Sequence, residues 1–196
     1  MPSGGAVIDC RRPPLRRMVR FVLTSKGPAM SIARETMSES DDAAPVEMLA
    51  QLFDAHGWPC EFINEDEMCG EIQGSWATYQ MRGIWRREDQ VLQLLCLPEI
   101  RITDDKFKPA FELLALINEQ VWLGHFDIWS QGGVLLYRHG MMLGDGLLSL
   151  PMAQMAVENA VSECDRFYPA FQFVLWGDKK PKDALASALV DAAGEA

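Results

Sequence analysis

The sequence contains no long hydrophobic stretch. Its longest uninterrupted apolar runs are about five residues, such as residues 113–117 (LLALI). A helix that crosses a bilayer needs about 20 predominantly apolar residues. The arginine-rich residues 11–20 resemble the start of a signal peptide, but the apolar run beside them is short and Arg20 interrupts it. We therefore expect a soluble chain that does not associate with membranes.

The sequence also lacks any regular cysteine or histidine motif. Its five cysteines are odd in number and scattered, with no C-x-x-C pair, which is typical of reduced thiols in a cytoplasmic protein. A metal site would need three or four converging ligands. His125 and Asp127 share a face of a predicted hairpin, whereas a two-residue turn places His139 on the other face. We expect neither a metal nor a cofactor.

Basic residues are scarce outside the N-terminus. The chain has 18 basic and 28 acidic residues, and residues 1–29 hold six of the basic ones and one of the acidic ones. The remaining chain has a formal charge of −15 and repels a phosphate backbone, with no basic stripe to offset it. The balance argues against direct nucleic-acid binding.

No catalytic motif is visible. A nucleophilic cysteine needs a base within hydrogen-bond reach, and the candidates lie in no recognisable pattern. We expect Cys96, in an apolar strand, and Cys164, on a helix face, to pack in the core, so we predict no catalytic residue. An acidic cluster lacks calcium-loop spacing and predicts a solvated turn. The thiol candidates are Cys60, Cys69, Cys96 and Cys164, the bases are His56, His125 and His139, and the cluster is Glu61, Glu65, Asp66, Glu67 and Glu71.

Residues 106–138 carry the clearest secondary-structure pattern in the chain. Apolar residues at helical spacing predict a helix from about Asp105 or Lys106, with Pro109 in its first turn, and Gly124 is expected to stop it. The period then changes to two, and a turn at 131–132 or 132–133 predicts a β-hairpin. That hairpin would bring Asp127 and Arg138 together on one face.

The rest of the chain supplies the other elements. We predict a helix from Pro45 to about Gly57, strands at 60–64, 68–73, 76–86 and 91–97, and a helix capped by Ser149. Pro169 is expected to bend or interrupt that last helix. The order α-β-β-β(-β)-α-β-β-α indicates an α+β fold with helices against an antiparallel sheet.

The aromatic segment near the C-terminus is the strongest candidate for a binding surface. It is too apolar to be a free tail, so it either packs in the core or forms a homodimer or partner interface. Phe171 and Trp176 are the preferred anchors. The interface candidates are Phe167, Phe171, Phe173 and Trp176.

Several long blocks carry a family resemblance. They are residues 85–89 (WRRED), 112–130 (ELLALINEQVWLGHFDIWS), 135–139 (LLYRH), 162–177 (SECDRFYPAFQFVLWG) and the ending ALASALVDAAGEA. Over about residues 45–196 the chain resembles the YbjN-domain family of bacterial sensory transduction regulators, most closely its alphaproteobacterial branch. The resemblance implies a fold like that of type III secretion chaperones, which are small α+β homodimers that bind other proteins. It brings no catalytic residues.

We expect the chain to divide into three parts. Residues 1–44 are expected to be a disordered extension, of which residues 1–29 would lie upstream of the true start at Met30. Residues 45–177 would form the YbjN-like α+β domain, and residues 178–196 an amphipathic helix and tail. The function expected is that of a non-enzymatic, homodimeric regulator or chaperone-like adaptor that binds an unknown protein. A small-ligand sensor and an enzyme with a cysteine or carboxylate centre are the alternatives.

Overall fold

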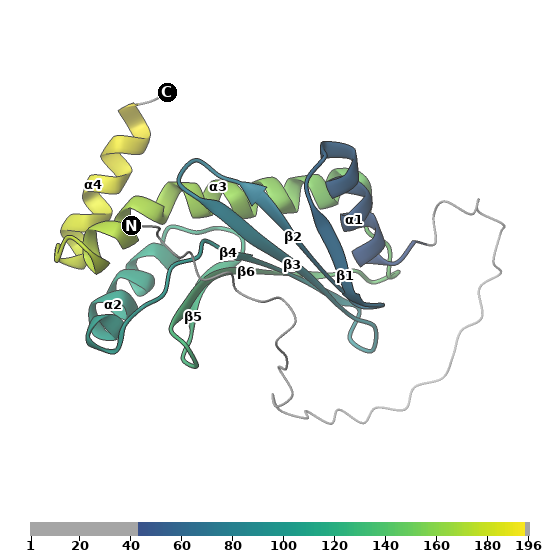
Figure 1. Cartoon of the computed structure of the whole chain (residues 1–196), viewed down its shortest axis with the longest axis horizontal. Helices are drawn as coiled ribbons and strands as arrows, with labels where there is room; N and C mark the ends of the chain where they lie inside the picture. Colours follow the sequence, from purple (N-terminus) through teal and green to yellow (C-terminus); the bar gives the residue numbers. More distant parts are fainter. Residues whose placement is uncertain (1–42, 195–196) are drawn as a thin grey trace, which may run out of the picture. The chain divides into compact units, whose positions relative to one another are not determined.

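A six-stranded antiparallel sheet with strand order β1-β2-β3-β4-β6-β5 forms the framework of this computed structural model (Figure 1). The structure describes residues 43–194, with side chains through residue 189, so nearly all of the predicted extension 1–44 lies outside it. The strands are β1 (Cys60–Asn64), β2 (Glu67–Gln73), β3 (Thr78–Arg86), β4 (Val91–Leu97), β5 (His125–Trp129) and β6 (Val134–Met142). The helices are α1 (Pro45–His56), α2 (Phe107–Asn118), α3 (Leu150–Leu175) and α4 (Pro181–Gly194).

The α+β class and the predicted order of elements are confirmed, with four strands before α2. A 3-10 turn at Asp104–Lys106 precedes α2, which therefore begins slightly later than expected. The helix also ends at Asn118, earlier than the expected stop at Gly124. The reason is that the Asn118 side chain bonds to the backbone of Phe126, which requires the chain to turn back before Gly124. Within residues 43–194, no helix combines the length and apolarity needed to cross a membrane.

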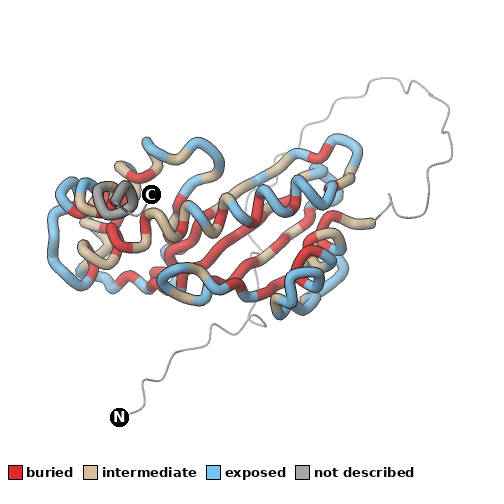
Figure 2. Tube along the Cα trace, turned by 90° about the horizontal axis from the view of Figure 1, so that it is seen from above, coloured by how far each residue is buried: buried red, intermediate tan, exposed pale blue. Residues whose placement is uncertain are grey.

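The main core lies between the sheet and its helices (Figure 2). Buried positions follow the central strands, whereas exposed positions gather in turns and on the outer sides of the helices. Helix α3 packs on β4 and β6, α1 on β1, β2 and β3, and α2 on β5. The sheet-facing stripe of α3 consists mainly of small side chains, which allow its backbone to approach the strands closely. This stripe includes Ala153, Ala156, Val157, Ala160 and Cys164.

Two glycines give α1 its place on the sheet. An ideal Cβ at Gly70 would lie 2.5 Å from the Phe53 ring, and one at Gly83 would lie 2.5 Å from Leu49 Cδ1. Because real Cβ atoms do not approach so closely, any larger residue would push α1 away from β2 and β3. Glycine is therefore required at both positions for packing rather than for backbone conformation.

The β5–β6 hairpin has one of the two predicted registers. Trp129 pairs with Val134, and His125 with Arg138, as expected for a turn centred on Gln131 and Gly132. Arg138 Nη2 lies 3.3 Å from Asp127 Oδ2, so the predicted ion pair is present. On this face, opposite α3, a second, smaller apolar cluster is buried, made of Leu95, Leu97, Val134 and Leu136.

The sequence predicted that Pro169 would bend or interrupt α3; the helix continues through Pro169, so of these two alternatives the interruption was wrong. Proline has no N–H, and its place in the helix deprives the carbonyl of Asp165, four residues earlier, of its usual donor. Trp76 Nε1 supplies a replacement, donating to Asp165 O at 3.0 Å. A side chain from the β2–β3 loop thus stabilises the helix at the position where proline would otherwise disrupt it.

The Asp165 carboxylate extends this contact into a cluster that we call the Asp165 latch. It accepts hydrogen bonds from Ser75 N at 2.8 Å, Ser75 Oγ at 2.9 Å and Tyr79 Oη at 2.5 Å. The Trp76 ring stacks on Tyr168 of α3, with ring centroids 6.3 Å apart. Burial, followed by the bond to Asp165, raises the pKa of Tyr79 above its ordinary value, and the protonated hydroxyl donates to the carboxylate. The latch fixes the β2–β3 loop to the middle of α3.

We predict that Trp76→Phe lowers the free energy of unfolding by about 1 kcal/mol, because it leaves Asp165 O without its donor while retaining most of the ring. In a Pro169→Ala background the restored N–H can bond to that carbonyl, so the cost of Trp76→Phe should fall. Urea unfolding of the two single variants and the double variant measures this coupling. Equal costs in both backgrounds would contradict the proposed compensation.

The two edges of the sheet differ. At the β5 edge the Asn118 side chain acts like a neighbouring strand: its Oδ1 accepts from Phe126 N at 2.8 Å and its Nδ2 donates to Phe126 O at 3.0 Å. Asp127 Oδ1 accepts from Ile128 N at 2.8 Å. Side chains therefore occupy the backbone groups that an added strand would need, a common protection of sheet edges.

Asn118→Ala should remove both bonds to Phe126 and lower the free energy of unfolding by roughly 1–3 kcal/mol, given about 0.5–1.5 kcal/mol per hydrogen bond. It should also open the β5 edge and promote association. Urea titration and light scattering report the two effects. Asn118→Asp retains the acceptor alone, so it should show an intermediate loss of stability; an Asn118→Ala protein as stable and monodisperse as the parent would disprove the role.

Candidate functional site

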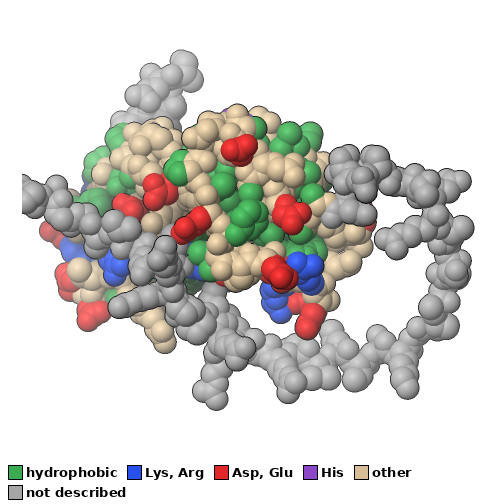
Figure 3. Space-filling view, turned by 45° about the vertical axis from the view of Figure 1, so that its right-hand side comes forward, with side chains coloured by type: hydrophobic (Ala, Val, Ile, Leu, Met, Phe, Trp, Pro, Cys, Tyr) green, Lys and Arg blue, Asp and Glu red, His purple; other side chains and the backbone are tan. Residues whose placement is uncertain are grey.

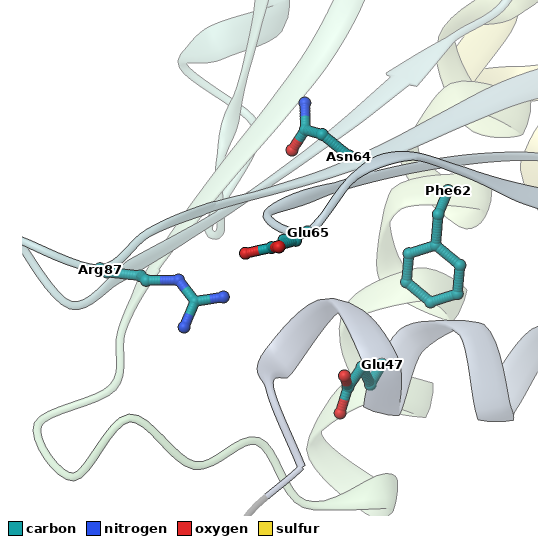
Figure 4. A pocket seen from close by; sticks show the side chains of 5 residues that line it. All are labelled: Glu47, Phe62, Asn64, Glu65 and Arg87. Carbon is teal, nitrogen blue, oxygen red and sulfur yellow. The ribbon is translucent and has the colours of Figure 1, made fainter.

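The candidate site is a groove at the opposite edge of the sheet, beside β1. We call it the β1 groove. It has a volume of about 410 Å³ and is open to solvent. Figure 4 shows the Phe62 ring directed toward α1, near Glu47, with Glu65 and Arg87 farther along the groove. Its lining residues are Glu47, Phe62, Asn64, Glu65 and Arg87.

Local sequence features hold these side chains in place. Glu47, in the first turn of α1, accepts a hydrogen bond from Ala44 N at 3.1 Å, which fixes the start of the helix after the N-cap position. Asn64 Oδ1 accepts from Asp66 N at 2.9 Å and shapes the β1–β2 turn. Arg87 Nε donates to Asp66 Oδ1 at 2.6 Å and joins the β3–β4 turn to it. The groove is thus bounded by one helix start and two neighbouring turns.

Most of the charged residues around the groove are acidic. Arg87 is paired with Asp66, and Arg82 is paired with Glu67. Among the described residues, no ion pair involves Glu47, Glu61, Glu65 or Glu71. Figure 3 shows separate acidic side chains among hydrophobic surface where this end of the domain comes forward. Such a surface can bind an apolar and basic group by contact and charge.

Among residues 43–194, no strand pairs with the outer edge of β1. Glu71 N bonds to Pro59 O at 3.0 Å, and the register pairs Glu61 with Cys69 and Phe62 with Met68. Antiparallel pairs alternate between bonded and non-bonded, so Glu61 bonds toward β2 while the N–H and C=O of Cys60 and Phe62 point away from it. The Phe62 side chain is 53% exposed beside these groups. The β1 edge therefore offers both backbone partners and an apolar contact.

The predicted aromatic interface residues do not lie together on the surface. Phe167 and Phe171 are buried and both pack their rings against Phe126, at centroid distances of 5.8 and 5.7 Å. Phe173 is partly buried, with Lys179 Nζ 4.7 Å above its ring. Trp176 is 62% exposed just after α3. Of the four, Trp176 is the one with most of its surface available to a partner, and its interface role stays a prediction.

The cysteine and histidine candidates are also separated. Cys96 and Cys164 are fully buried, and Cys164 Sγ donates to Cys96 Sγ at 3.5 Å, where burial raises the pKa of Cys164 well above its usual value. Cys69 Sγ donates to Glu61 Oε1 at 3.7 Å, and Cys60 is exposed on β1. His56 Nδ1 bonds to Leu52 O at 2.9 Å and its ring stacks on Trp58. Cys10 lies outside the described residues. Within those residues, no group of three or more His, Cys, Asp or Glu side chains could hold a metal ion.

Part of the His139 ring is buried. Its Nδ1 is buried with no hydrogen-bond partner among residues 43–194, and burial lowers its pKa below the ordinary 6.5. As the pH falls through about 6.5, the unfolded chain takes up a proton more readily than the folded one, so stability decreases. Burial raises the pKa of the Glu163 carboxyl, against the opposing charge of Arg166, and this group acts in the opposite direction at lower pH.

We therefore predict that the melting temperature falls between pH 7.5 and 5.5, and that His139→Gln reduces this fall because glutamine does not titrate in that range. Calorimetric scans of both proteins at several pH values make the comparison. A His139→Gln protein with the same pH dependence as the parent would rule out the histidine as the cause.

Sequence reasoning did not single out Phe62 or Trp122, which are among the exposed aromatic residues. Phe62 was placed in a strand, but its exposure follows from β1 being an edge, which the sequence does not specify. Trp122 is 97% exposed in the loop after α2, where Tyr137 Oη donates to Leu123 O and Asn159 Nδ2 donates to Tyr137 Oη at 2.7 Å. For Phe62, the missing information was the order of the strands in the sheet.

Comparisons with known proteins agree with the predicted family. A family model named YbjN, described as "Putative bacterial sensory transduction regulator", matches residues 45–173. No curated protein gives a significant match.

Two solved structures match part of the chain. A crystal structure of YbjN from E. coli has a TM-score of 0.45 at 10% identity, over 61% of this chain and 85% of that one. A crystal structure of the ExsC–ExsE complex has a TM-score of 0.46 at 16% identity, over 62% of this chain and 88% of that one.

Proposed function

Because the chain belongs to the YbjN family, we propose that it is a non-enzymatic regulator or chaperone-like adaptor that acts by binding another protein. The family match covers the sheet, α1, α2 and most of α3, and therefore includes the β1 groove. The observation that supports the proposal most directly is the open β1 edge with an exposed phenylalanine beside it. An edge of this kind is a common site of protein recognition.

Large apolar side chains on the surface provide further support. In water an exposed tryptophan or phenylalanine contributes little to stability, whereas interfaces are enriched in aromatic residues and methionine. Backbone and side-chain hydrogen bonds hold the Trp122 loop in position, so the indole is presented by a fixed support. The described residues that expose a large apolar side chain include Phe62, Trp122, Leu123, Met142, Met155 and Trp176.

The same exposed apolar residues also support self-association. We propose a homodimer, with Trp176 and Trp122 as the aromatic residues most available to it. Phe167 and Phe171 would contribute to such an interface indirectly, by fixing the end of α3 against Phe126. The β1 groove would then be available for a different protein. An open groove whose arginine is already paired favours this binding role over catalysis, which needs converging polar groups in an enclosed pocket.

Affinity capture with the tagged full chain tests the proposal. We expect the parent to retain a specific protein and Phe62→Ala to retain at least about threefold less of it, since truncating a central aromatic contact costs upward of about 1 kcal/mol. Phe111→Ala removes a similarly exposed phenylalanine from α2, at the other edge of the sheet, and should behave like the parent.

Size-exclusion chromatography with light scattering tests the dimer separately. The parent should elute as a dimer, and Trp122→Ala combined with Trp176→Ala should shift it toward monomer while circular dichroism remains unchanged. A monomeric parent that captures no protein would refute the proposed function.

A further inference from the structure

We infer that the β1 groove binds an extended, basic segment of the partner protein, which adds to the sheet as a seventh strand beside β1. The inference rests on the proposed protein-binding function and specifies how that binding occurs. It commits to a strand whose residues alternate between apolar and basic. Three independent properties of the site support it: the backbone edge, the apolar contact and the distribution of charge.

The backbone edge defines the mode of binding. The outward N–H and C=O groups of Cys60 and Phe62 are spaced as one strand presents them to the next. At the far edge the N–H and C=O of Phe126 are both bonded to Asn118, and the N–H of Ile128 is bonded to Asp127. The fold therefore protects β5 and leaves β1 accessible, so strand addition is possible on one side of the sheet.

The groove defines the side chains that would face α1. Phe62 pairs with Met68, whose side chain is in the main core, so Phe62 lies on the helix-covered face of the sheet. An added strand would lie about 4.8 Å beyond β1. Every second residue of that strand would then point toward the Phe62 ring and the flank of α1. Apolar residues at these positions would cover the exposed phenylalanine.

The charges define the remaining side chains. Glu61 follows Cys60 and precedes Phe62, so it lies on the opposite face, and Glu71 of β2 lies on that face too. Neither carboxylate has an ion-pair partner among the described residues, and residues 43–196 contain 23 acidic and 11 basic side chains. Lysine or arginine at the alternate positions of the added strand would meet this negative surface. An acidic strand would be repelled.

Fluorescence anisotropy with a labelled peptide tests the inference on the full-length protein. The probe is an octapeptide, Val-Lys-Phe-Lys-Val-Lys-Phe-Lys, with blocked ends. We expect saturable binding that weakens as salt is added. A peptide of the same composition in the order Val-Val-Lys-Lys-Phe-Phe-Lys-Lys should bind at least about tenfold more weakly, and a peptide with Glu for Lys should not bind.

Backbone pairing is tested on both partners. N-methylation of alternate amides on one edge of the probe removes donors without changing its side chains, and methylation of the amides that face β1 should weaken binding by about three- to tenfold per lost hydrogen bond. Phe62→Pro should weaken it further than Phe62→Ala, because proline also removes the outward N–H, and edge strands tolerate proline. Glu61→Lys with Glu71→Lys should weaken binding, whereas Glu112→Lys on α2 should not.

The outcomes separate this inference from the proposed function. Equal binding of the alternating and rearranged peptides, or no effect of N-methylation at either edge, would overturn strand addition. Strand addition would also be overturned if the alternating peptide did not bind. If Phe62→Ala nevertheless reduced capture of the natural partner, the proposed function would stand and the partner would bind the groove in another way.

Discussion

Close packing of α3 against the sheet is the constraint on which the rest of the fold depends. The helix has 26 residues and lies over β4 and β6. Its small inward side chains allow this approach, but Pro169 removes one internal hydrogen bond from its second half. Trp76 replaces that bond from the β2–β3 loop. Helix α3 and the β2–β3 hairpin therefore stabilise one another, because each completes its hydrogen bonds through the other.

This arrangement explains why the two sheet edges differ. Helix α2 packs on β5 and brings Asn118 within reach of its backbone, so the last strand on that side is closed. Helix α1 packs over the first three strands, held close by Gly70 and Gly83, and leaves Phe62 partly uncovered. The same layer of helices thus protects one edge and forms a groove at the other. The difference between the two edges arises from the placement of these two short helices.

Much of the fold could be predicted from the sequence because its signals are local. The neighbouring polar turns located β1 and β4 at their observed bounds, and the Ser149 cap located the start of α3. The change of period after α2 located the β5–β6 hairpin and its ion pair. These features depend on neighbours a few residues apart, and such neighbours can be read directly.

The candidate site depended on long-range contacts and could not be read in the same way. Pro169 was expected to disrupt α3 because its compensating donor, Trp76, is 93 positions away in the sequence. Phe167 and Phe171 stayed interface candidates beside the alternative of core packing, because nothing local indicated that Phe126 would cover them. Phe62 gained significance only when β1 proved to be an edge strand. Knowing which strand lies last in the sheet requires the assembled structure.

The contact between Cys96 and Cys164 has a further consequence. One thiol belongs to the sheet and the other to α3, and both are buried, whereas Cys60 lies on the surface. A thiol reagent can reach the inner pair only after the helix has separated from the strands, because their burial depends on that contact. The rate at which a thiol reagent modifies these two sulfurs therefore measures how often the core opens. The exposed Cys60 thiol, which needs no such opening, gives the rate for comparison.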